Sequence, residues 1–240
     1  MAVTTPLSSE GMAGATSAPV IPIRSPLAPD GEPRVTVLVA GYLSYDKYHP
    51  EWGQRSAQSS VTLAQVAGRT ILVDTGQEDD QLLARLRAAG VAPEEVDTVV
   101  ITHTHGDHYK SLRVVPNAAV YASGPEHHAW RSRGGPDKEV LGKLVPVATG
   151  IAPGVRLLLT PGHTTGSATV LVAQAGQIVA IAGDAVDSRD FFLRREPSHN
   201  TLDPAAERRN FELLAAIADV VVPGHGRPFR LAHGAADEEL

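Results

Sequence analysis

The chain has 240 residues, enough for one folded domain with a tail, and its 21 basic and 27 acidic side chains give a formal net charge of −6. This acidic balance argues against broad electrostatic binding to nucleic acid. Because cysteine is absent, disulfides and thiolate metal ligands are excluded.

The two ends of the chain differ from its middle. Residues 1–34 are rich in Pro, Ser, Thr, Ala and Gly, which predicts a flexible arm that could dock on the partner subunit of a homodimer. Residues 35–232 are expected to form the folded domain, and residues 233–240 an acidic C-terminal tail. No secretory signal pattern and no apolar stretch of roughly 20 residues occurs, so we expect a cytoplasmic protein that does not enter a membrane.

Apolar patterning predicts strands over residues 35–40, 61–67, 70–73, 96–101, 118–122, 155–159, 168–173, 178–182 and 220–222. Leucines at helical spacing predict a helix over residues 81–89 that stops at Gly90. A second helix begins at Asp203-Pro204 and runs to about Ala218. The strands occur in clusters separated by helices, which predicts an α/β (α+β) fold of two packed sheets with helices outside.

The most informative segment directly follows the strand expected at residues 96–101. It places three imidazoles and one carboxylate within six positions, namely His103, His105, Asp107 and His108. Imidazole and carboxylate suit Zn²⁺, Fe²⁺ or Mn²⁺. The segment therefore predicts a metal site.

Three later segments each place one further ligand after a strand and beside glycine. They contribute His163 after residues 155–159, Asp184 after residues 178–182, and His225 after residues 220–222. Glycine allows a sharp turn and a close approach of the backbone. Strand ends of one sheet lie on one edge, so we expect these turns to converge on the same cleft.

With these motifs the chain resembles the metallo-β-lactamase-fold hydrolases over roughly residues 35–230, with Asp74-Thr75-Gly76 as a further shared motif. The resemblance implies a four-layer αββα sandwich with a two-metal site at one edge. It implies that the first metal is held by His103, His105 and His163. It also implies that the second is held by Asp107, His108 and His225, with Asp184 bridging both.

More narrowly, the chain is similar to the subgroup named metallo-β-lactamase domain-containing protein 1. The shared stretches are residues 71–76, 90–93, 218–226 and 228–230. That subgroup has been associated with RNA hydrolysis.

Such a site would carry two Zn²⁺ ions, with Fe or Mn as alternatives, and a bridging hydroxide as the nucleophile. We expect Asp107 to orient the hydroxide and to take up its proton. Asp74 is not a ligand in the family pattern. It is expected to accept a hydrogen bond from a ligand imidazole, although a plain strand-end turn is the alternative.

Substrate contacts are expected from aromatic and basic side chains in loops near the ligands. The aromatic candidates are Tyr42, Tyr109, Phe191 and Phe192, and the basic ones are Lys110 and Arg194. The alternative is that the loop aromatics only pack on one another and that the charged groups are simply solvated.

The leading hypothesis is a dinuclear metal-dependent hydrolase of a small ester, thioester or lactone. The alternatives are a phosphodiesterase or ribonuclease, a mononuclear iron dioxygenase acting on sulfur compounds, and a non-enzymatic metal-binding protein. The complete second ligand set favours two metals. A small-molecule substrate fits the acidic balance better than nucleic acid.

Overall fold

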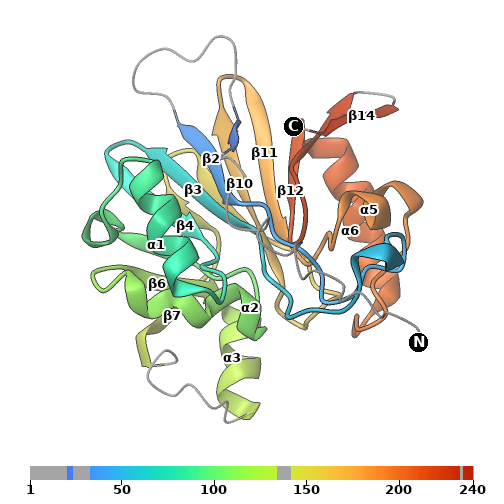
Figure 1. Ribbon diagram of the computed structural model, residues 1–240, viewed down its shortest axis with the longest axis horizontal. Helices are drawn as coiled ribbons and strands as arrows, with labels where there is room; N and C mark the ends of the chain where they lie inside the picture. Colours follow the sequence, from blue (N-terminus) through green and yellow to red (C-terminus); the bar gives the residue numbers. More distant parts are fainter. Residues whose placement is uncertain (1–20, 24–32, 134–141, 233–234, 240) are drawn as a thin grey trace, which may run out of the picture.

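The computed structural model describes residues 21–23, 33–133, 142–232 and 235–239. Two seven-stranded sheets face each other at the centre of the molecule, with helices on their outer sides (Figure 1). Of the predicted N-terminal arm, residues 1–20 and 24–32 lie outside the described residues, as do residues 233, 234 and 240 of the predicted C-terminal tail. Within the described residues, no helix is long and apolar enough to cross a membrane.

The first sheet uses the strands in chain order, β1 to β7. Strands β1 to β4 pair antiparallel, and β4 to β7 pair parallel. Its strands are β1 (Ile21–Ile23), β2 (Arg34–Val39), β3 (Val61–Val66), β4 (Arg69–Val73), β5 (Thr98–Val100), β6 (Ala119–Ser123) and β7 (Leu144–Val147).

The second sheet uses the remaining strands, again in chain order, from β8 to β14. Only β11 and β12 pair parallel. Its strands are β8 (Gly150–Ala152), β9 (Val155–Leu159), β10 (Ala168–Gln174), β11 (Gln177–Gly183), β12 (Val220–Pro223), β13 (Phe229–Ala232) and β14 (Ala235–Glu239).

Helices cover the outer face of each sheet. The first sheet carries α1 (Asp79–Ala88), α2 (Gly106–Tyr109) and α3 (Gly124–Arg133), and the second carries α5 (Arg189–Arg194) and α6 (Pro204–Ile217) (Figure 1). Short 3-10 helices occur at η1 (Pro50–Trp52), η2 (Pro93–Glu95) and η3 (Lys110–Val114). The predicted αββα layering is thereby confirmed.

The alternation of side chains along each strand builds three cores. In β4, Ile71 and Val73 face the cluster between the sheets, whereas Leu72 faces the cluster shared with Leu82 and Leu86 of α1. A third cluster packs α5 and α6 onto the outer face of the second sheet. Strands covered on both faces are near-continuous apolar runs, which is why these segments are recognisable in the sequence. Each fully buried Val, Leu or Ile stabilises the fold by about 1.5–3 kcal/mol.

Strand direction places the ligand segments at one edge. Strands β4 and β5 run parallel, so Asp74 and the histidine segment leave the first sheet at the same edge. In the second sheet β9 is antiparallel to β10, and β10 to β11, so β9, β11 and β12 all point the same way. His163, Asp184 and His225 follow these three strands and therefore meet.

The ends of the chain contain short strands that the sequence patterns did not predict. Within the predicted flexible arm, Ile21–Ile23 pairs with β2. Within the predicted tail, Ala235–Glu239 pairs with β13. These parts of both segments are edge strands, so the boundaries at residues 34/35 and 232/233 do not separate the sheets from the rest of the chain.

Candidate metal centre

The loop after β5 turns at once into α2 and carries four of the seven expected ligands. Their donor atoms combine with those from the second sheet into two groups, within each of which the atoms lie no more than 4.8 Å apart. One group is His103, His105, His163 and Asp184, and the other is Asp107, His108 and His225. The structure thus brings all seven predicted ligand side chains together.

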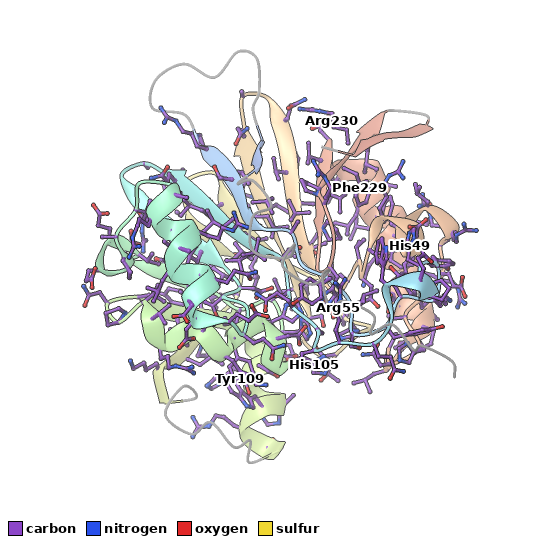
Figure 2. All side chains as sticks on the ribbon, viewed as in Figure 1. His49, Arg55, His105, Tyr109, Phe229 and Arg230 are labelled. Carbon is purple, nitrogen blue, oxygen red and sulfur yellow. The ribbon has the colours of Figure 1, made fainter. Side chains whose placement is uncertain are left out.

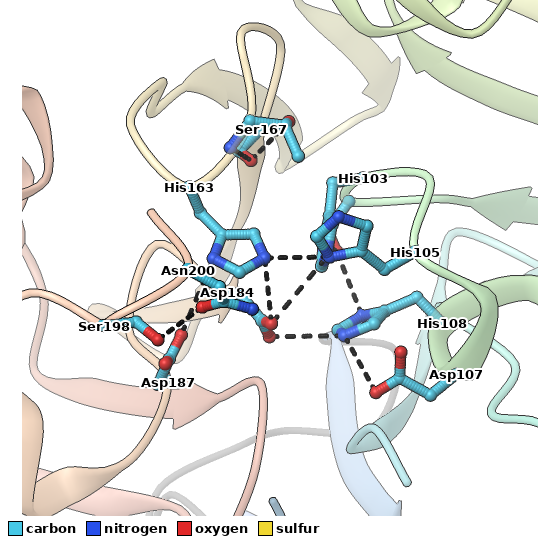
Figure 3. Close-up of polar contacts among 12 residues, drawn as sticks. His103, His105, Asp107, His108, His163, Ser167, Asp184, Asp187, Ser198 and Asn200 are labelled. Atoms are coloured by element: carbon cyan, nitrogen blue, oxygen red, sulfur yellow. Dashed lines mark hydrogen bonds and ion pairs between the residues drawn. The ribbon is translucent and has the colours of Figure 1, made fainter. Parts of the chain in front are cut away.

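The carboxylate of Asp184 lies between the two groups. Its Oδ2 is 3.3 Å from His163 Nε2 and 3.7 Å from His103 Nε2. Its Oδ1 is 3.2 Å from His108 Nε2 and 3.4 Å from His225 Nε2. Each oxygen therefore faces a different group (Figure 3), which is the arrangement that a bridging ligand of two metals requires.

Asp107 lies at the open side of the centre. Its Oδ2 is 3.7 Å from both His108 Nε2 and His225 Nε2. Its side chain is 17% exposed, whereas those of His103, His108 and His163 are completely covered. Asp107 is therefore a ligand candidate that solvent or a substrate can also reach.

Several donor atoms of the centre are buried without a hydrogen bond. They are His103 Nε2, His108 Nε2 and Asp184 Oδ1. A buried polar atom left unsatisfied costs about 1–3 kcal/mol. Bound cations would satisfy all three atoms at once, so the residues fit a metal pair.

The electrostatics of the site also suit cations. Burial and the neighbouring His108 hold the pKa of His103 well below its usual range, so this imidazole is neutral and free to bind a metal. Burial opposes ionisation of Asp184, but the surrounding imidazoles of His108 and His225 outweigh it and hold its pKa well below the usual range. Burial lowers the pKa of His108 and His225, but the Asp184 carboxylate outweighs it, so that the pKa of His108 lies well above its usual range and that of His225 is raised to about 9. These two imidazoles would therefore release a proton when a metal binds.

The far nitrogens of two ligand imidazoles have fixed partners. His108 Nδ1 lies 2.8 Å from Asp74 Oδ2, the kind of position that the sequence predicts for Asp74. Asp74 also accepts hydrogen bonds from the backbone N and the hydroxyl of Thr102, both at 2.8 Å. His225 Nδ1 lies 2.9 Å from the backbone oxygen of Gln58. These partners fix the ring orientations, as they do in metal sites generally.

Glycine is required at two places where the backbone reaches Asp184. Gly183 has a φ of +51°, and a Cβ there would lie 2.5 Å from Thr102 Oγ1. A Cβ on Gly224 would lie 1.9 Å from Asp184 Oδ1. Gly224 therefore makes room for the ligand itself, and Gly183 makes room for Thr102.

A family model described as the metallo-beta-lactamase superfamily matches residues 56–225, the part of the chain that contains both His/Asp groups. The chain belongs to this superfamily. A human protein named metallo-beta-lactamase domain-containing protein 1 is 38% identical over 197 residues, covering 80% of this chain and 71% of that protein. The predicted similarity to this subgroup is thereby confirmed.

Solved structures show the same fold at low identity. A probable metal-dependent hydrolase from Staphylococcus aureus has a TM-score of 0.72 at 17% identity, over 88% of this chain and 97% of that one. AidC, a dizinc quorum-quenching lactonase, has a TM-score of 0.66 at 17% identity, over 86% and 90%. At this identity the likeness establishes the fold alone.

Two of the aromatic residues expected to contact substrate belong to the core, which corrects the prediction. Tyr109 ends α2 on the first-sheet side of the molecule (Figure 2). It is buried in the cluster that also contains Leu82 and Leu86, and its ring lies 5.0 Å from that of Trp130. Phe192 is buried in the cluster with Phe211 and Phe229. These two side chains therefore follow the alternative stated above, in which the aromatic residues pack on one another.

The other substrate candidates lie near the surface or beneath a loop. Phe191 is buried and meets the ring of Tyr48, over which the Arg194 guanidinium lies at 4.7 Å. The hydroxyl of Tyr42 donates to Glu78 at 3.3 Å. These contacts make Phe191, Arg194 and Tyr42 part of the packing of the β2–β3 loop.

Lys110 is the exposed cation nearest to the ligand segment among the predicted substrate residues. Its Nζ donates to Gln77 Oε1 at 3.4 Å. Its side chain lies over Gly106, where a Cβ would be 2.7 Å from Lys110 Cε. Gly106 separates His105 from Asp107, so the Lys110 side chain lies over the backbone of the ligand loop.

Sequence reasoning missed three residues that support the ligands. Gln58 supplies a backbone carbonyl to His225, and the buried Asp187 places Oδ1 3.9 Å from His163 Nδ1. Glu126 bonds to both ligand loops. None has a local motif, because each becomes a neighbour of the ligands only through the fold.

Proposed function

We propose that the protein is a hydrolase that uses two divalent metals, zinc in the first instance, on a small ester, thioester or lactone. The observation that carries this proposal is the shared position of Asp184, with one oxygen toward each ligand group. A mononuclear site would need only one of these groups. The completeness of both groups supports a pair of metals.

The chain's own residues have defined tasks in this chemistry. When bound, the metals supply Lewis acidity and lower the pKa of water toward about 7. His103, His105 and His163 would hold one metal, and His108 and His225 the other. Asp107 is the exposed carboxylate among the ligands, so it is placed to accept the proton of the attacking water.

The substrate class rests on charge and on similarity. The net charge of −6 disfavours a long polyanion as substrate. The dizinc lactonase of the same fold shows that this architecture can open a lactone. Lys110, whose side chain lies over Gly106 in the ligand loop, offers one positive charge, which suits a small substrate with a carboxylate or carbonyl oxygen.

Metal content and a substrate panel test this proposal. Purified protein is analysed for elements, and then assayed on lactones, thioesters, aryl esters and bis-p-nitrophenyl phosphate, with Asp184→Ala as the inactive control. We expect about two zinc ions per chain and turnover of the carbonyl substrates. One iron per chain would indicate a dioxygenase instead, and turnover of the phosphodiester alone would indicate a nuclease.

A further inference from the structure

A buried acid outside the ligand set lies between the two loops that supply the first ligand group. Glu126, in the first turn of α3, is 0% exposed. Its Oε1 accepts hydrogen bonds from the backbone N of Thr104, at 2.8 Å, and from the Thr104 hydroxyl. Its Oε2 accepts a hydrogen bond from the Thr164 hydroxyl at 2.6 Å. One carboxylate thus binds two segments that are 60 residues apart.

Both threonines are direct neighbours of metal ligands. Thr104 separates His103 from His105 in the loop after β5 of the first sheet. Thr164 follows His163 in the loop after β9 of the second sheet. Glu126 therefore connects the loops that carry all three imidazoles of the first group. The second group, by contrast, is supported by Asp74 and by the Gln58 carbonyl.

The backbone around Glu126 is in close contact with the second of these loops. A Cβ on Gly166 would lie 2.0 Å from Glu126 N, so this loop rests directly on the start of α3. Ser123 Oγ donates to Gly166 O at 2.6 Å and accepts from Glu126 N at 3.1 Å. The connection is therefore rigid on both sides of the carboxylate.

Charge gives Glu126 a second means of acting on the site. Its carboxylate opposes the lowering of the pKa of His105, which burial causes. This negative charge therefore reaches the first ligand group.

We propose that Glu126 is a positioning residue that sets the affinity of the first metal by fixing the separation of the two ligand loops. The metal held by Asp107, His108 and His225 depends on other contacts and is affected much less. This inference rests on the proposed two-metal function, but it is tested through metal affinity rather than turnover.

The test compares Glu126→Gln with the wild-type protein in competition with a chromophoric chelator, using Zn²⁺ and Co²⁺ as probes. The amide keeps the size of the side chain but removes its charge and one acceptor. We expect one of the two metals to bind 10–100-fold more weakly, the usual effect of losing a partner that orients ligands. The ligand-field spectrum of Co²⁺ shows which site is affected, with His163→Ala and His225→Ala as references for the two groups.

Asp97→Asn is the control. Asp97 likewise accepts hydrogen bonds from a backbone N–H and a threonine hydroxyl, those of Thr70 and Thr98, but it lies next to the start of β5, opposite to the end that carries the ligand loop. We expect this variant to keep both metal affinities. Equal weakening in both variants would reduce Glu126 to a general fold contact and overturn the inference.

Thr164→Val keeps the inference testable if Glu126→Gln does not fold. It removes only one hydrogen bond, and we expect a smaller loss, about 3–10-fold, at the same site. Wild-type affinity in either folded variant, or equal loss at both metal sites, contradicts the role assigned to Glu126. If the wild-type protein itself binds no metal pair, it is the proposed function that fails.

Discussion

The position of the Asp184 carboxylate depends on two neighbouring glycines, Gly183 and Gly224. Gly183 adopts a φ of +51°, a conformation that L side chains rarely adopt, and turns the chain so that the next residue faces both ligand groups. Gly224 lies so close that Asp184 Oδ1 occupies the space of its absent Cβ. Because the carboxylate has one place to lie, each of its oxygens is directed to one group.

Gly224→Ala tests this argument. The added methyl would lie 1.9 Å from Asp184 Oδ1 and 2.9 Å from the carbonyl carbon of Gly183, so the carboxylate must move. We expect at least a tenfold loss of affinity for both metals, and destabilisation by about 1–3 kcal/mol from overpacking. Isothermal titration and chemical denaturation measure the two effects. Gly150→Ala, with nothing within 4 Å of the added atom, is the control and should change neither.

Asp107→Asn separates metal binding from proton transfer. The amide keeps an oxygen that faces His108 and His225 but cannot take up a proton. With the metals added to saturation, kcat should fall by a factor of about 10²–10⁴, the usual contribution of a general base. Steady-state kinetics on the best substrate of the panel measures the effect. Near-normal turnover at full metal content would show that Asp107 only binds metal.

The seven ligands were predictable because each follows an apolar strand and most adjoin glycine. Gln58 was not, because its contribution is a backbone carbonyl that meets a histidine 167 residues away. The role of Glu126 could not be predicted from the sequence either, since a Glu at the start of a helix is common. Tyr109 and Phe192 were misassigned because proximity to a ligand in the chain does not say which way a ring points.

Helix α6 is attached directly to one of the ligand turns. Its N-cap Asp203 accepts hydrogen bonds from Ala205 N and Ala206 N, at 3.0 and 2.9 Å. The backbone N of Asp203 donates to Gly162 O at 2.9 Å. The start of the helix is thereby attached to the turn that presents His163.

Asp203→Ala should destabilise the protein by about 0.5–2 kcal/mol, because two backbone N–H groups at the start of α6 lose their acceptor. Asp203→Ser retains a capping oxygen and should recover most of this loss. Urea denaturation followed by circular dichroism compares the three proteins. Equal stability of the alanine and serine variants would mean that the cap contributes nothing.

The central strands were predictable because burial on both faces leaves continuous apolar runs. Helices α1 and α6 were predictable because α1 carries leucines at helical spacing and α6 has a capping signal. The short strands at or next to the outer edges of the sheets were not predictable. β1, β13 and β14 lack a long apolar run, and their pairing is decided by the neighbouring strand. Helix α5 has only six residues, too few to show a helical period.

For the whole molecule, metal binding and stability are coupled, since the ligands come from both sheets. At a metal concentration 100 times the Kd, each site adds about 2.7 kcal/mol of stability. For a domain of this size this corresponds to a melting temperature about 5–10 °C higher per site. Calorimetry before and after dialysis against a chelator measures the difference, and added Zn²⁺ should restore it. An unchanged melting temperature would argue against binding of the metals across the sheets.

The order of the strands has a consequence for how the protein is made. Strands β1 to β7 form one sheet and β8 to β14 the other, so all strands of the first sheet are translated before those of the second. Each ligand group takes members from both halves: His103 and His105 with His163 and Asp184, and Asp107 and His108 with His225. A nascent chain that ends before β9 therefore holds no complete group. Both ligand groups are thus complete only in a chain whose two halves have closed on each other.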